Sequence, residues 1–157
     1  MKLQQWLEKW GMTGLKLNVG FLESEWAPQD PDRNAAWELY IELLTRIATQ
    51  PLPAEYGDEQ AALTSVYSLF GLTRDILKRH GKYATQFAKV AIPILNQVVR
   101  PFTAKWHAIS VAGSFKESAM RDAFREELVQ LQNVLQKYTK SLADIAGVED
   151  LTTLEQA

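Results

Sequence analysis

Apolar side chains recur every three or four residues over most of residues 30–147. This spacing places them along one face of an α-helix. Asp30 and Asp58 are of the residue type that caps a helix N-terminus, and Gly81 and Gly147 are of the type that ends a helix. The pattern predicts an all-α fold, and four helical segments joined by short loops predict a four-helix bundle.

The first two helices are predicted from Asp30 to the residue before Pro51 and from Asp58 to Gly81. The first has a proline in its first turn, where the missing N–H costs nothing. The second ends in a basic turn, and cations suit the negative end of a helix. The apolar face predicted for the first helix consists of Trp37, Tyr40, Ile41, Leu44, Ile47 and Ala48.

The third helix is predicted over residues 83–112, and it contains Pro93 and Pro101. A proline inside a helix removes one hydrogen bond and clashes with the preceding turn, so we expect a bend or a break at one of them. The segment contains no acidic residue, and its middle is apolar on most sides. It is therefore expected to be the central and most buried helix.

The fourth helix is predicted to begin at Ser114 and Glu117, which have the spacing of a capping box, and to end at Gly147. Its apolar residues alternate between steps of four and three, which keeps them on one seam over about six turns, as bundles require. The seam consists of Phe124, Leu128, Leu131, Leu135, Tyr138, Leu142 and Ile145.

Residues 1–29 follow a different pattern and are expected to form an arm outside the bundle (30–147), with a short tail at 148–157. Apolar residues 3, 6, 7 and 10 predict a short amphipathic helix. Residues 15–21 then alternate between apolar and polar, as in a strand, and no second strand is apparent to pair with it. Such a strand would pair with its copy in a dimer or with another protein's sheet. The alternative is an extended segment lying over the bundle.

The composition excludes several kinds of chemistry. The sequence contains no cysteine, which excludes disulfides, thiolate catalysis and zinc sites built on sulfur. Its two histidines, His80 and His107, belong to no metal-binding motif, and no phosphate-binding glycine loop is present, so we expect no metal and no cofactor. The longest low-charge stretch, residues 90–99, is about half as long as a membrane span. We expect a soluble cytoplasmic protein.

Basic residues gather in the middle of the chain, although the net charge is −2. Residues 74–107 carry seven basic side chains and one acidic one, Asp75, besides both histidines. Such a stretch can bind an anionic partner, RNA among them. The alternative, which we favour from the sequence, is that it packs beside the acidic flanks and is neutralised within the fold.

One segment of this basic stretch carries candidate catalytic residues. Arg100 and His107 are close to two helical turns apart and share one helix face, which Asn96 joins one turn earlier. The segment resembles the Arg-x4–6-His motif of the HEPN superfamily, whose members are helical bundles and often metal-independent RNases. The resemblance implies that Arg100 stabilises phosphate charge and that His107 acts as acid or base. The spacer is the longest of that motif, and Pro101 stands where the family usually has a polar residue.

A structural role for the same two residues is the alternative, and the sequence favours it. Arg100 has apolar neighbours on both sides along the chain, so a buried guanidinium is expected to pair with a carboxylate across the core. His107 would then cap a backbone group. The candidate carboxylates are Glu38, Glu42 and Asp75.

Tryptophan gathers in the arm, at Trp6, Trp10 and Trp26. Tryptophan is enriched at interaction hot spots, so these residues and Phe21 are predicted to contact a protein partner or a second copy of the chain. The alternative is packing on the bundle. Since catalytic residue types are sparse and apolar periodicity is strong, the sequence predicts a non-enzymatic interaction or regulatory module, self-associating or binding a protein. The second hypothesis is an HEPN-like RNase or RNA-binding protein.

Overall fold

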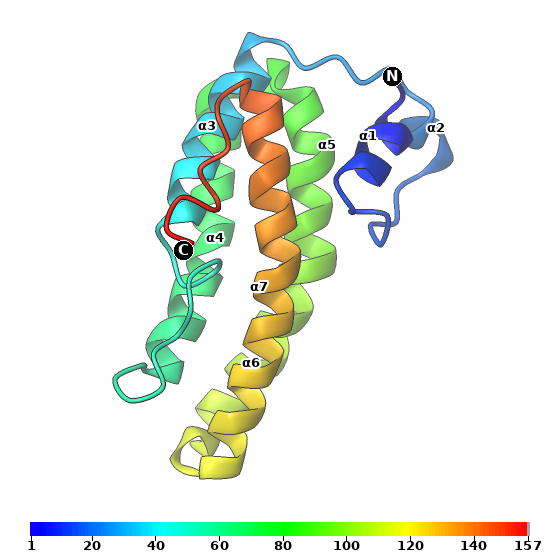
Figure 1. Ribbon diagram of the computed structural model, residues 1–157. Helices are drawn as coiled ribbons and strands as arrows, with labels where there is room; N and C mark the ends of the chain where they lie inside the picture. Colours follow the sequence, from blue (N-terminus) through cyan, green and yellow to red (C-terminus); the bar gives the residue numbers. More distant parts are fainter. Residues whose placement is uncertain (157) are drawn as a thin grey trace.

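The computed structural model describes residues 1–156, and its regular structure is helical apart from an isolated bridge between Lys2 and Glu25. The all-α prediction is therefore confirmed. Figure 1 shows the long helices lying side by side, with the N-terminal arm against one flank next to α5. The elements are α1 (Leu3–Lys9), α2 (Val19–Leu22), α3 (Asp30–Leu44), α4 (Glu59–His80), α5 (Thr85–Pro93), α6 (Arg100–Val111) and α7 (Ser118–Ala146).

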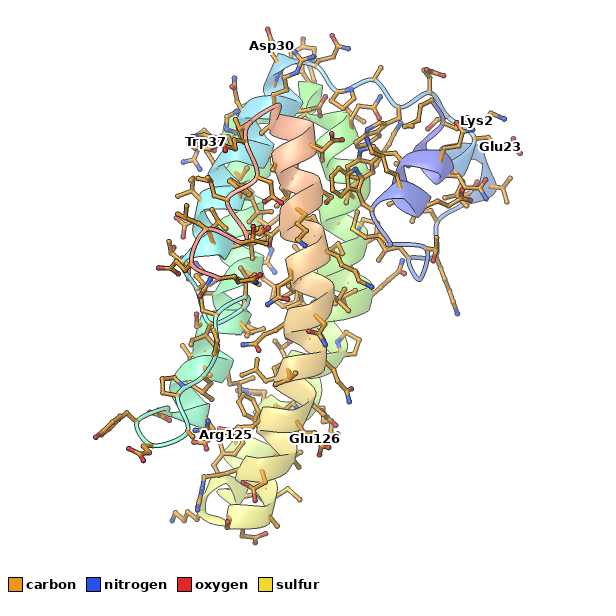
Figure 2. All side chains as sticks on the ribbon, viewed as in Figure 1. Lys2, Glu23, Asp30, Trp37, Arg125 and Glu126 are labelled. Carbon is orange, nitrogen blue, oxygen red and sulfur yellow. The ribbon has the colours of Figure 1, made fainter. Side chains whose placement is uncertain are left out.

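Helix α3 is shorter than predicted and buries a different face. It ends at Leu44, and the residues that follow form turns. The carbonyls of Ile47 and Gln50 in these turns accept hydrogen bonds of 2.7 Å from Gln132 on α7. Trp37 and Ile41 are 44% and 39% exposed, so the predicted apolar face was wrong at these positions. Figure 2 shows Trp37 on the outer side of α3. The side chains that α3 buries are Asp32, Ala35, Ala36, Leu39, Tyr40 and Leu43.

Asp32 joins the start of α3 to the start of α5. Its carboxylate is fully buried, and it accepts hydrogen bonds of 2.8 Å from the backbone N–H groups of Gln29 and Phe87. Gln29 is the N-cap of α3, so the predicted cap at Asp30 was wrong by one residue. One buried carboxylate therefore satisfies a helix end and fixes a neighbouring helix.

The third predicted helix passes both prolines without a break. Between α5 and α6 the residues Ile94–Val99 form π-helical turns, and Pro101 lies in the first turn of α6. A π-helix pairs residues five apart instead of four, and this wider turn lets the helix continue although Pro101 has no N–H to donate. This helix, which we call the α5–α6 rod, also has an open outer face that includes Ile92, Asn96 and Arg100. The prediction that it is the most buried helix was wrong.

Helix α7 carries the seam that its sequence predicts. All seven predicted seam residues, from Phe124 to Ile145, are buried. Gly147 ends the helix with a φ of 70°, a conformation that favours glycine. The start was predicted wrongly, because Ser114–Lys116 form a separate 3-10 turn and α7 begins at Ser118 with Glu117 as N-cap.

The predicted strand at residues 15–21 was wrong. Its first half is extended without a partner strand, and its second half forms α2. The side chain of Gln97 takes the place of a partner strand, because its Oε1 accepts from the Lys16 N–H and its Nε2 donates to the Lys16 carbonyl, both at 2.8 Å. The arm is thereby fastened to the α5–α6 rod, and its extended part lies over the bundle.

Arg125 on α7 holds the loop that precedes α4 (Figure 2). Its guanidinium donates to the carboxylate of Glu59 at 3.0 Å and to the backbone carbonyls of Leu52, Pro53 and Gly57 at 3.3, 3.0 and 3.1 Å. These bonds satisfy carbonyls that no regular element pairs. Arg125 is thus a structural cation and contributes nothing to an open charged surface.

Tyr138 is buried, and its hydroxyl has no hydrogen-bond partner within residues 1–156. Because a desolvated hydroxyl without a partner destabilises a fold, we expect Tyr138→Phe to raise the free energy of unfolding at pH 7 by about 1 kcal/mol. Urea denaturation of the two proteins measures this difference. A loss of 1 kcal/mol or more, an amount typical of a made hydrogen bond, would contradict the expectation.

The same substitution should change the response to alkali. Burial raises the pKa of the Tyr138 phenol above its ordinary value. The stability contributed by the neutral phenol is complete below the unfolded pKa of about 10 and is lost as the pH rises through the folded pKa. Between about pH 9 and pH 11, Tyr138→Phe should therefore lose less stability than the wild-type chain. Equal losses would mean that the phenol ionises equally easily in both states.

None of the helices within residues 1–156 is both long and apolar enough to cross a membrane.

Candidate interaction surface

An outer face with several exposed basic side chains lies where α4 runs against the α5–α6 rod. The two are antiparallel: Gln60 at the start of α4 accepts a hydrogen bond from Ser110 near the end of α6, and Phe70 lies under Arg100 at mid-length. At the opposite end Leu77 and Ala88 line the same hollow. The two helices therefore lie side by side over this length, and we call the line along which they meet the α4–rod seam.

A shallow groove of about 380 Å³ opens at the α4–α5 end of this seam. Its floor is aliphatic, because it consists of the N-cap residue of α5, Ala84, and of Ala88 and Ile92, which lie one turn apart on α5. Ile92 is 47% exposed, although it is a large apolar side chain. We call this hollow and its rims the basic groove; it is lined by Leu77, Lys78, Gly81, Lys82, Ala84, Thr85, Ala88 and Ile92.

Basic side chains surround the groove without acidic partners. Arg74, Lys78, Lys82 and Arg100 are all exposed, and none of them forms an ion pair within the part of the chain that the structure describes. Asp75 is exposed on α4, one position after Arg74 and three before Lys78, but it forms no ion pair with either within the described residues. The groove rim therefore carries exposed cations without ion-pair partners, with one carboxylate nearby.

Other basic residues of the stretch 74–107 are neutralised, as the alternative interpretation of the sequence expected. Glu38 on α3 lies 3.5 Å from Arg79 and 2.6 Å from His80. On α7, Glu127 pairs with Lys105 and accepts a 2.6 Å hydrogen bond from Trp106 Nε1. Carboxylates thus pair with some basic residues of the stretch 74–107, whereas the cations at the groove rim stay unpaired within residues 1–156.

Burial by itself would raise the pKa of the Glu127 carboxyl, but the hydrogen bonds from Lys105 and Trp106 outweigh it and lower that pKa below its ordinary value. Glu127 is therefore a carboxylate at neutral pH. A lowered folded pKa contributes stability that is present above the unfolded pKa and lost as the pH falls through the folded one. Lys105 is thus neutralised across the neutral range and adds no free charge to the seam.

The expected burial of Arg100 was wrong. Its guanidinium is exposed, donates to Asn96 Oδ1 at 3.1 and 3.4 Å, and stacks over Phe70 with its carbon 4.7 Å from the ring centroid. The guanidinium of Arg74 lies over the same ring at 5.8 Å. The apolar neighbours of Arg100 in sequence point into the core, whereas Arg100 turns outward, so it needs no buried carboxylate.

His107 is also exposed, and it makes no hydrogen bond within residues 1–156, so the expected backbone cap was wrong. Asn96, Arg100 and His107 share one face of the α5–α6 rod by their spacing. Of these three, only Asn96 and Arg100 are bonded to each other. No group of three or more His, Asp and Glu side chains in the described part of the chain is placed to hold a metal ion.

Because both side chains are exposed, we expect Arg100→Ala and His107→Ala each to lower the free energy of unfolding by less than about 1 kcal/mol. The remaining cost at Arg100 is its stacking on Phe70. Urea denaturation measures both values. Losses of about 3–5 kcal/mol would instead indicate a buried ion pair.

The arm turns most of its aromatic side chains inward. The Trp6 and Trp26 rings are buried with their centroids 4.4 Å apart, and Trp6 Nε1 donates to Asp144 on α7 at 2.8 Å. Trp10 is half-buried. Phe21 is 53% exposed beside Lys89. The structure brings Trp6 and Trp26 together but not Trp10 and Phe21, and partner binding by these four residues stays a prediction.

Sequence reasoning did not single out Lys78, Lys82, Ala88 or Ile92 as a site. The available signal was the excess of basic over acidic residues in the stretch 74–107. Lys78 was explained by the helix end alone, and α5 was expected to be buried. Which of the basic side chains escape neutralisation depends on where Glu38 and Glu127 come to lie.

Comparisons with protein-family models, with curated proteins and with solved structures give no match for this chain.

Proposed function

We propose that the protein is a non-enzymatic interaction module that binds an acidic protein partner in the basic groove. Its scaffold is a four-helix bundle in which the α5–α6 rod counts as one helix. The arm belongs to this scaffold, since Trp6 and Gln97 fasten it to α7 and to the rod. The binding surface is the exposed basic groove between α4 and α5.

One observation carries the proposal: cations without an ion-pair partner in the described part of the chain lie beside an aliphatic floor from which Ile92 is exposed. Lys78 and Lys82 line the groove, and Arg74 lies one turn before Lys78 on α4. Positive charge around an apolar centre is the arrangement of an interface, with a desolvated core and a polar rim. Charge complementarity then selects an acidic partner and speeds its association.

Exposed residues on and just before α6 support a second candidate function. Arg100, His107 and Asn96 share an exposed face, as the HEPN resemblance requires, so RNA binding or cleavage there is the competing proposal. We favour a protein partner because the groove floor is aliphatic. Single-stranded nucleic acid is bound by stacking its bases on exposed aromatic rings, and the residues that line the groove include none, although Tyr83 beside Lys82 is 70% exposed.

Affinity capture with the full chain as bait tests the proposal in the cells that produce it. Lys78→Glu with Lys82→Glu reverses the groove charge at exposed positions, so the fold should survive. We expect one or more captured proteins to be lost from this double variant. Lys116→Glu is the matched control, because Lys116 is exposed and lies beyond the opposite end of the rod, in the 3-10 turn after α6; it should retain them.

The proposal would be wrong if the same proteins bind all three baits, or if the bait captures no protein at all. RNA recovered with the wild-type bait, lost on Lys78→Glu with Lys82→Glu and cleaved without metal, would favour the competing proposal. In that case Arg100→Ala and His107→Ala should abolish cleavage while the variants stay folded.

A further inference from the structure

We propose that the element bound in the basic groove is an amphipathic α-helix of the partner, with apolar side chains on the floor and carboxylates four residues apart facing α4. This inference rests on the proposed function and goes further by fixing the shape and register of the bound segment.

The shape follows from the floor. Ala88 and Ile92 lie one turn apart on α5, and the buried Ala84 precedes them at its N-cap, so the floor has the spacing of a helix surface. Ala88 is small and half-buried, and beside it Ile92 projects with 47% of its surface exposed. A hollow next to a ridge at helical spacing accepts the ridges of another helix, as in ordinary helix packing. The binding mode is therefore that of a helix in a groove.

The register follows from the cations. Arg74 and Lys78 lie on consecutive turns of α4, about 6 Å apart along its axis. A partner helix lying along the seam has the same rise, so carboxylates at positions i and i+4 meet both cations at once. Lys82 stands at the end of the same rim, in the 3-10 turn that follows α4, and can meet a further acidic residue.

Arg100 and Arg74 extend this rim on the α6 side. Both guanidiniums stack on the ring of Phe70, and Asn96 Oδ1 holds that of Arg100 at 3.1 Å. Two like charges held over one ring repel each other, and a carboxylate between them would relieve that repulsion. Stacking leaves the N–H edges of a guanidinium free to donate to such a carboxylate.

The test uses the full chain and a synthetic helical peptide of roughly 16 residues, long enough to fold on the floor. Its leucines follow steps of four and three along one face, and its glutamates are four residues apart along one edge of that face. A second peptide carries glutamine in place of each glutamate. Isothermal titration calorimetry measures the dissociation constants at low and at physiological salt.

We expect the glutamate peptide to bind at least about tenfold more tightly than the glutamine peptide, and Lys78→Glu with Lys82→Glu to remove that difference. Ile92→Asp should weaken binding of both peptides, because the floor is then charged. Val111→Asp is the control at the far end of α6, where Val111 is 74% exposed, and it should leave both affinities unchanged.

Four results would overturn the inference. The first is equal affinity of the glutamate and glutamine peptides. The second is tighter binding of a single-stranded oligouridine that is weakened by the same variants, which indicates nucleic acid. The third is a chain whose mass rises with concentration and falls on Ile92→Asp, which indicates a second copy in the groove. The fourth is a peptide that fails to bind while affinity capture still depends on Lys78 and Lys82. In that case the bound element is not an amphipathic helix, and the proposed function stands.

Discussion

Replacing Leu135 with alanine should lower the free energy of unfolding by about 2–5 kcal/mol. Leu135 is fully buried in the middle of the α7 seam, and α7 packs closely against α3. Removing Cγ and the two Cδ methyl groups loses their transfer free energy and leaves a cavity that rigid neighbouring helices fill only partly. Leu131, which is also buried in this seam, should behave in the same way. Urea denaturation followed by circular dichroism gives both values.

Val134→Ala is the matched control on the same helix. Val134 is adjacent to Leu135 but 37% exposed, so its truncation should cost well under half as much. If Leu131→Ala and Leu135→Ala both cost less than about 1 kcal/mol, the seam does not form the core and the assignment of α7 is wrong.

Replacing Asp32 with alanine should lower the free energy of unfolding by about 3 kcal/mol or more, because one buried and one partly buried N–H group lose a charged acceptor at once. These are the N–H groups of Gln29 and Phe87, so the start of α3 and the start of α5 are both affected. Hydrogen exchange should therefore accelerate in both helices. Acceleration in α3 alone would mean that the bond to Phe87 contributes nothing.

Asp30→Ala provides the comparison for Asp32. Asp30 is in the same turn, but it is exposed and pairs only with Arg33 at 2.7 Å, so we expect a loss below about 1 kcal/mol. Equal losses for Asp30→Ala and Asp32→Ala would indicate a general effect of negative charge at the helix N-terminus.

The sequence predicted the helices best where periodicity and end signals agreed. On α7 all seven positions picked out by the alternation of four and three residues are buried, and Gly81 and Gly147 marked the ends of α4 and α7. The face of α3 was predicted wrongly because Ala35 and Ala36 give little apolar signal, yet they fill the contact where Trp37 would be too large. Periodicity identifies large apolar residues, and close packing selects small ones.

Long-range side-chain contacts explain the remaining differences. The strand predicted at residues 15–21 lacked a partner in the sequence, and Gln97 supplies its hydrogen bonds from a helix. Arg100 was expected in the core because its neighbours are apolar, but its own position on α6 points outward. The candidate site depends on which cations remain unpaired, and this is decided by the positions of distant carboxylates such as Glu38.

The central claim is that partners bind in the basic groove, and site-specific photo-crosslinking tests it most directly. A photoreactive amino acid at Ile92 is compared in living cells with the same group at Trp37 and at Phe21, the exposed apolar residues of α3 and of the arm. The account predicts a discrete protein adduct from position 92, which disappears when Lys78→Glu and Lys82→Glu are added. Adducts from position 37 or 21 alone, or an adduct at position 92 that consists of RNA, would contradict it.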